Sequence, residues 1–230
     1  MACTQCASEH EANETASSLE RMLYFPRQLL TADDMRTEQR YFLEKLKRHN
    51  RFLHGDGVVC GLLVVPDPQG SAMGVKVCPG FALGPFGDEI FVEEPAPFDL
   101  SRCAQARTAD CRPVGAVVQP LNAPKILQVK IRYVECPSRP MRVLPAGCGC
   151  DESACEYSRT RDGFELRCNV KPPPAPVVIK EKPDAAAPQC ADPPTDPWLL
   201  LAEVTASANG LTIDNRVRKV VRNTPSGGFA

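Results

Sequence analysis

The sequence predicts an α+β fold, in which one long N-terminal amphipathic helix packs on a mainly antiparallel β domain with long Pro-rich and Cys-rich loops. Three observations predict it. A helical apolar period occurs between residues 31 and 55, several short runs further on have strand character, and the chain holds 23 prolines and 12 cysteines. Prolines favour loops and edge strands over helices. With 230 residues and 43% hydrophobic content, the chain is large enough to build a core.

The helix is expected to begin after Thr31, a suitable N-cap, and to stop at Gly55. At 3.6 residues per turn, four large apolar residues share one stripe: Met35, Phe42, Leu46 and Leu53. This stripe is predicted to face the β domain. Replacing Phe42 with Ala should therefore cost about 3–5 kcal/mol through cavity formation.

Other residues of this helix point away from the apolar stripe, toward its charged side. Tyr41 and Phe52 are aromatic, and Lys45 and Arg48 are basic. One interpretation is that the two rings cover neighbouring loops. The other is that these four residues form a partner-binding surface, with Tyr41 and Phe52 as its anchors.

The segments after the helix have strand character and are joined by turn signals. Alternation of apolar and polar residues is cleanest at 127–134 and recurs at 164–170. Shorter or less regular runs, in chain order, are 58–65, 75–78, 81–83, 90–92, 95–100, 198–206 and 211–213. Ala208-Asn209-Gly210 between the last two is a hairpin turn signal. Gln128, Lys130, Arg132, Glu165 and Arg167 are expected to point outward.

The predicted organisation follows from these patterns and from composition. We expect a flexible arm at 1–20, a helix-plus-β domain at 21–170 with a Cys-rich loop at 136–155, a Pro-rich extended segment at 171–197, the domain's closing β-hairpin at 198–222 and a flexible tail at 223–230.

Two polar clusters leave alternatives open. Asp88, Glu89, Glu93 and Glu94 are carboxylates close in sequence, which could act as general acid and base or form a solvated loop. Cys3 and Cys6 have the spacing of half a zinc site, or are free thiols on the N-terminal arm.

Four further cysteines fall within twenty residues: Cys136, Cys148, Cys150 and Cys155. In a loop between two strands they could bind one structural zinc ion, the cofactor that this sequence allows. Their spacing differs from paired C-x-x-C motifs, so reduced or disulfide-linked loop cysteines are the other interpretation.

Composition narrows the function classes. A net charge of −1 without a basic tract gives no reason to expect nucleic-acid binding. No run approaches the ~18 apolar residues of a membrane span, and no signal peptide is evident. We therefore expect a cytoplasmic protein without membrane insertion. The sequence shows no nucleophile–base pair and no phosphate-binding glycine loop, so an enzyme is not predicted.

Several separate pieces resemble one family. YFPRQLLTADDMRTEQRYFLEKLKRHNRFLHGDGVVCGLLV is similar to the N-terminal signature of proteins encoded beside extracellular contractile injection systems, which are phage-tail-like particles. GFALGPFGDEIFVEEPAPFDL, IRYVECPSRPMRVL, CGCDESACEYSRTRDGFELRC and PWLLLAEVTASANGLTIDNRVRKVV are similar to its later segments. The resemblance covers roughly residues 22–170 and 197–222.

The resemblance implies a non-enzymatic structural component that docks onto baseplate, spike or tube proteins, in several copies, within a particle that can be released from the cell. The alternative, from the cysteines alone, is a zinc-stabilised cytosolic adaptor that uses the Cys136–Cys155 cluster.

Overall fold

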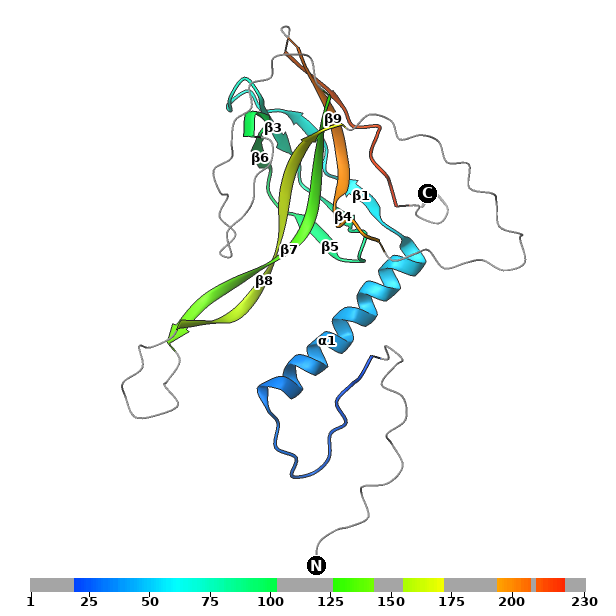
Figure 1. Cartoon of the computed structure of the whole chain (residues 1–230), viewed down its shortest axis with the longest axis vertical. Helices are drawn as coiled ribbons and strands as arrows, with labels where there is room; N and C mark the ends of the chain where they lie inside the picture. Colours follow the sequence, from blue (N-terminus) through cyan, green and yellow to red (C-terminus); the bar gives the residue numbers. More distant parts are fainter. Residues whose placement is uncertain (1–18, 103–125, 143–154, 172–193, 208–209, 222–230) are drawn as a thin grey trace, which may run out of the picture. The chain divides into compact units, whose positions relative to one another are not determined.

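The computed structural model describes residues 19–102, 126–142, 155–171, 194–207 and 210–221 (Figure 1). The chain divides into two compact units, Met1–Arg48 and His49–Ala230. The first unit holds nearly all of helix α1 (Ala32–His49), and the second holds the ten strands of the described residues. The α+β class with antiparallel sheets is as predicted. The finer domain boundaries stay a prediction.

Helix α1 begins where its sequence predicts. The Asp34 amide donates to the Thr31 hydroxyl oxygen at 3.2 Å, and the Thr31 amide donates to the Asp34 carboxylate at 2.8 Å. This reciprocal pair satisfies backbone donors of the first turn, as a capping box does. The helix continues as a π-helical turn, η1 (Asn50–His54), and Gly55 ends it with φ +74°. Thr31 and Gly55 therefore delimit the helix as expected.

The packing of the helix on the β unit stays a prediction. No residue of α1 is buried in the described chain. Met35 is 50% exposed, Phe42 56% and Leu46 47%, and Leu53 of η1 is 69% exposed. The periodicity correctly indicates which residues share a side, but it cannot indicate what covers that side. Within the described residues, Phe42 is thus an exposed side chain.

The strands form three antiparallel sheets. The first contains β1 (Gly57–Gly61), β4 (Gly80–Leu83) and β5 (Glu89–Val92). The second contains β2 (Val64–Pro66), β3 (Gly74–Val77) and β6 (Ala96–Asp99). The third has the order β10 (Gly210–Asp214), β9 (Leu199–Ser207), β7 (Ile126–Arg142) and β8 (Cys155–Val170). A 3₁₀ turn, η2 (Leu100–Arg102), follows β6.

The run 58–65, expected as one strand, is two strands in different sheets. The chain bends at Gly61 and Leu62, which have φ +63° and +53°. Gly61 lies directly opposite Gly80, and a Cβ on Gly61 would collide with the Pro79 carbonyl oxygen. A residue with a side chain cannot make this close approach. Because both positions are glycine, the antiparallel pair β1–β4 of the first sheet can continue into the antiparallel pair β2–β3 of the second sheet.

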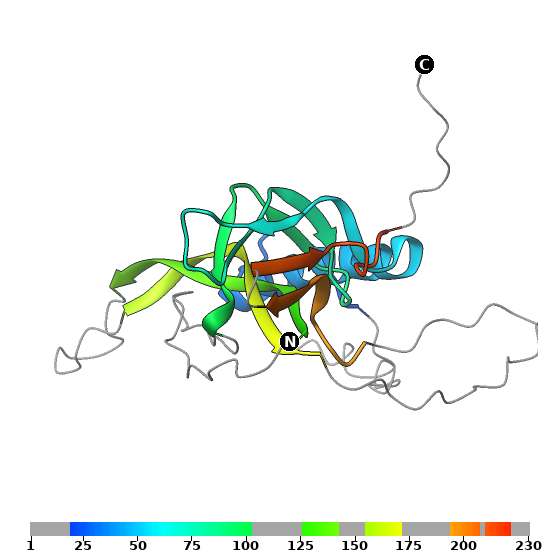
Figure 2. The same cartoon turned by 90° about the horizontal axis from the view of Figure 1, so that it is seen from above.

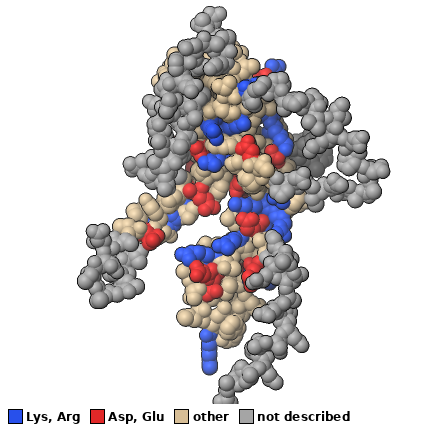
Figure 3. Space-filling model, viewed as in Figure 1, with Lys and Arg blue, Asp and Glu red and all other residues tan. Residues whose placement is uncertain are grey.

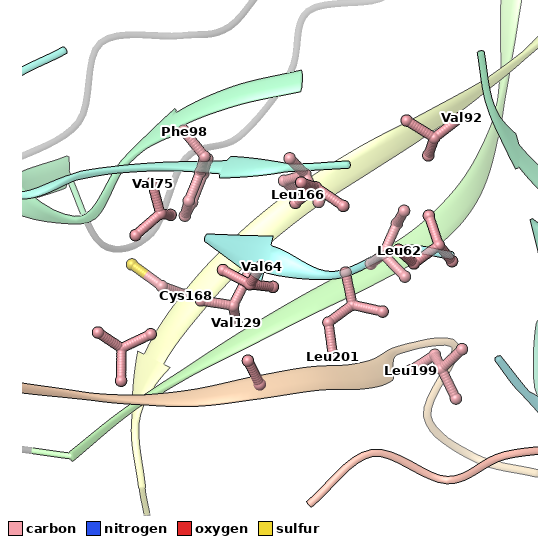
Figure 4. Packing of buried hydrophobic residues seen from close by; sticks show 14 of the residues in the cluster. Leu62, Val64, Val75, Val92, Phe98, Val129, Leu166, Cys168, Leu199 and Leu201 are labelled. Atoms are coloured by element: carbon pink, nitrogen blue, oxygen red, sulfur yellow. The ribbon is translucent and has the colours of Figure 1, made fainter. Parts of the chain in front are cut away.

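One hydrophobic core joins all three sheets. In Figure 2 the cyan and teal strands form one layer and the green, yellow and orange strands form the other. Side chains from both layers meet between them, as Figure 4 shows for Val75 and Phe98 on one side and Val129 and Leu166 on the other. Leu62, forced into the bend, is fully buried here. This burial offsets its unfavourable backbone conformation.

The hairpin of β7 and β8 is longer than the two predicted strands. Pairing continues from Leu127↔Val170 in the core out to Arg142↔Cys155. The predicted Cys-rich loop 136–155 is therefore shorter, because both its ends are strand. The outer part, residues 137–142 and 155–161, extends beyond the other strands of the β unit (Figure 1). It lacks buried residues among those whose side chains are described.

The segment after β10 forms hydrogen bonds with the edge strands β2 and β1 of the β unit. The Asn215 side chain exchanges two hydrogen bonds with the backbone of Val64, at 2.9 and 3.0 Å, and so completes a pairing at the edge of β2. Further on, the Val58 amide donates to the Lys219 carbonyl at 2.8 Å. The predicted closing hairpin β9–β10 is present, with Ser207 opposite Gly210.

Candidate partner-binding site

Tyr41 is the centre of a cation–aromatic cluster on α1. The Lys45 ammonium lies 5.5 Å from the Tyr41 ring centroid, and the Arg21 guanidinium carbon lies 5.9 Å from it. The Phe42 ring meets Tyr41 edge-on, with centroids 5.2 Å apart. Each cation–π contact at an exposed site contributes about 0.5–1 kcal/mol. These contacts favour one orientation of the half-buried Tyr41 ring.

Tyr41, Lys45 and Arg48 are spaced i, i+4 and i+7, so they share one face of α1. Phe52 belongs to the second unit and is 45% exposed, with the Arg51 guanidinium carbon 4.5 Å from its ring centroid. The predicted residues are thus aromatic rings accompanied by cations. Their partner-binding role stays a prediction.

The remaining charge is spread rather than concentrated. Basic and acidic side chains are interspersed over the face of the molecule in Figure 3. Many exposed cations are already paired within the chain, as in Arg36–Asp33 at 2.6 Å and Arg216–Asp214 at 3.0 Å. A surface of this kind provides local contacts rather than a long-range field of one sign.

A second cation–aromatic cluster was not predicted, because its residues were expected to point outward into solvent. Glu165 is only 4% exposed, and its carboxylate pairs with the Arg132 guanidinium at 2.6 Å. The Arg132 and Arg167 guanidinium carbons lie 4.8 and 5.6 Å from the Trp198 ring centroid. Trp198 therefore packs against the outer face of the hairpin. One signal for this cluster was available in the sequence. The chain has one tryptophan, and alternation places Arg132 and Arg167 together on the outward face of their strands.

Three of the four carboxylates in the predicted acidic cluster line an open cleft. Glu89, Glu93 and Glu94 are joined there by Asp162 and three phenylalanines, and Arg161 supplies a positive charge. The Tyr133 hydroxyl donates to Asp162 at 2.6 Å. Burial, and then this hydrogen bond, raise the pKa of Tyr133 well above its ordinary value. Tyr133 therefore stays protonated at neutral pH and provides no base for acid–base chemistry.

Two of the four predicted zinc ligands, Cys136 and Cys155, lie within the described residues. Cys136 is disulfide-bonded, whereas Cys155 is free and exposed. Cys148 and Cys150, like Cys3 and Cys6, lie outside the described residues. A disulfide sulfur is not a thiolate ligand, so Cys136 does not offer a thiolate in this state. The shared zinc site stays a prediction. Within the described ranges, no group of three or more His, Cys, Asp or Glu side chains is placed to bind a metal ion.

No protein-family model and no curated protein matches the sequence. Among solved structures, the chain is similar to a chain of the type VI secretion system TssK-TssF-TssG baseplate subcomplex, with 12% identity and a TM-score of 0.43. The match covers 86% of this chain and 60% of that chain. So distant a likeness carries no argument about function. In the described part of the chain, no helix is both long and apolar enough to cross a membrane.

Proposed function

We propose that this chain is a non-enzymatic structural component of a phage-tail-like contractile injection particle, which docks onto baseplate, spike or tube proteins. The resemblance of residues 22–170 and 197–222 to proteins encoded beside such particles supports this class of particle. The observation that carries the docking role is α1, a capped helix that presents aromatic and aliphatic side chains without burying any residue. Such side chains are the usual anchors of protein interfaces.

The face formed by Tyr41, Lys45 and Arg48 is the proposed contact with other particle proteins, and Phe52 is a further anchor. Tyr41 is already oriented by its cations, so little side-chain freedom is lost on binding. The nearby cations favour a partner surface that carries carboxylates.

We further propose that the protein is cytoplasmic while the particle assembles and leaves the cell only with the particle. Disulfides at Cys136 and Cys168 fit exposure to an oxidising environment after release. The cytosol alone would keep such cysteines reduced.

Purification of the tagged chain from its native host tests the proposal. Mass spectrometry should find sheath, tube and baseplate proteins in the eluate, and negative-stain microscopy should show rod-like particles. The double variant Tyr41→Ala/Phe52→Ala should lose these proteins while it keeps the wild-type circular dichroism spectrum. Val217→Ala, which removes an exposed apolar side chain elsewhere, is the matched control and should retain them. A clean monomer with stoichiometric zinc would overturn the proposal.

A further inference from the structure

The apolar stripe of α1 lies beside the Tyr41 face on the same helix, since the Phe42 ring of the stripe meets the Tyr41 ring. The stripe advances by four, three and four positions along the chain, through Met35, Gln39, Phe42 and Leu46. This is the alternating spacing of a coiled-coil seam, in which each side chain enters a gap on a facing helix. Met35, Phe42 and Leu46 are each about half exposed or more. The seam is therefore formed on the chain without a facing helix among the described residues.

The charges of α1 favour a facing helix of the same sequence. The first half, Ala32–Arg40, carries three carboxylates and two guanidinium groups, for a net charge of −1. The second half, Tyr41–His49, carries one carboxylate and three basic side chains, for a net charge of +2 with His49 neutral. Two such helices attract each other when antiparallel, because each negative half then lies against a positive half.

From these two patterns we infer that α1 pairs antiparallel with α1 of a second copy of this chain, with Phe42 beside the two-fold axis. Glu38 precedes Phe42 by one turn, and Lys45 follows it by nearly one turn. Antiparallel pairing at Phe42 thus brings Glu38 of each copy against Lys45 of the other. Both positions flank the seam, where ion pairs set orientation and partner choice.

A parallel pair has no such match. In register, Glu38 and Lys45 of one copy would face the Leu43 and Asn50 positions of the other, which carry no charge. The helix dipoles would also be aligned side by side, which is unfavourable, whereas antiparallel dipoles attract. Gln39 is the polar residue among these four seam positions, and a polar seam residue restricts the register in which two helices pair.

The test uses the purified full chain and sedimentation equilibrium over micromolar to submillimolar concentrations. The wild type should show a monomer–dimer equilibrium. Phe42→Asp, which places two carboxylates beside the axis, should give a monomer over the whole range. Thr37→Asp adds the same charge on the opposite side of the helix and is the matched control, which should leave dimerisation unchanged. Circular dichroism should show that every variant keeps the β unit.

A charge exchange tests the orientation. Glu38→Lys and Lys45→Glu, each alone, should weaken the dimer roughly tenfold by placing like charges together. The double variant should restore wild-type affinity, and an equimolar mixture of the two single variants should form a mixed dimer. Failure of the double variant to recover would overturn the antiparallel arrangement.

A wild-type monomer at every concentration would overturn the inference itself. If Phe42→Asp then also lost the particle proteins in the purification described above, the seam would belong to a different particle protein. That outcome would remove the self-pairing and leave the proposed function standing. The two conclusions therefore fail separately.

Discussion

Similar apolar side chains are exposed in helix α1 and buried in the β unit. Leu201, Ile131 and Val129 in the third sheet are fully buried, whereas Met35, Phe42 and Leu46 of the helix are half exposed. Both regions have regular apolar periodicity in the sequence. Periodicity therefore shows that a face is made to be covered, and only the structure shows whether the same chain covers it.

This difference separates folding from docking. The β unit buries its apolar side chains in one core that joins three sheets, so its stability is internal. The described apolar side chains of the helix are exposed, and in the proposed function they stabilise an assembly. Substitutions in the two regions should accordingly change different measurements.

The largest effect is expected in the core. Leu201→Ala leaves a cavity in the shared hydrophobic core, so the free energy of unfolding should fall by about 2–5 kcal/mol in urea denaturation. Leu63→Ala removes the same atoms from a leucine that is 43% exposed in the same unit. This control should lose less than about 1 kcal/mol. Equal losses for the two variants would contradict the assignment of the core.

A smaller effect is expected at the outer face of the β7–β8 hairpin. Glu165→Ala removes the carboxylate that binds Arg132, and Arg132 in turn packs on Trp198. Because Glu165 is buried but Arg132 remains partly exposed, the free energy of unfolding should fall by about 1–3 kcal/mol. Glu156→Ala, on the exposed outer part of the same strand, should be nearly neutral. A neutral Glu165→Ala would mean that the outer face is solvated, as its sequence predicted.

Glu165 also shows why the sequence predicted only part of this structure. Alternation assigned Glu165 to the outward face of its strand, but it could not show that Trp198 and Arg132 form a second layer there. The bend at Leu62 was missed for a related reason. A leucine with positive φ contradicts local preference and persists because the core surrounds it.

Features set by neighbouring residues were predicted well. Thr31 caps the helix, Gly55 ends it, and Gly210 pairs with Ser207 at the end of the last hairpin. Each depends on backbone conformation and hydrogen bonds within a few residues. The candidate site was predictable only in part. Tyr41 and Lys45 are in contact, as their i, i+4 spacing requires, but their partner cannot be read from that spacing.

Phe42 gives the most direct comparison between the two regions. Phe42→Ala should lower the free energy of unfolding of the isolated chain by less than about 1 kcal/mol, because a ring that is 56% exposed leaves no cavity. Phe98→Ala removes a ring that is 7% exposed and should cost about 3–5 kcal/mol. Chemical denaturation at low protein concentration, where self-pairing is absent, provides the measurement. A loss of several kcal/mol at Phe42 would place it in a core.

The smallest effect concerns the pH dependence of the helix cap. The Thr31 amide, and then its hydroxyl, donate to Asp34 and hold the pKa of that carboxyl below its ordinary value. A depressed folded pKa gives stability that is present above the unfolded value, about 3.9, and is lost as pH falls through the folded value. The helical circular dichroism signal should therefore decrease slightly as the pH falls below about 4.

Asp34→Asn tests this interpretation, because an amide does not titrate in that range. The variant should begin with slightly less helix at pH 6 and lose the part of the acid transition that depends on the cap. Glu44→Gln alters a carboxylate outside the first turn and should keep the wild-type transition. If Asp34→Asn also kept it, the cap would not be coupled to pH, and the helix would depend on contacts beyond its own first turn.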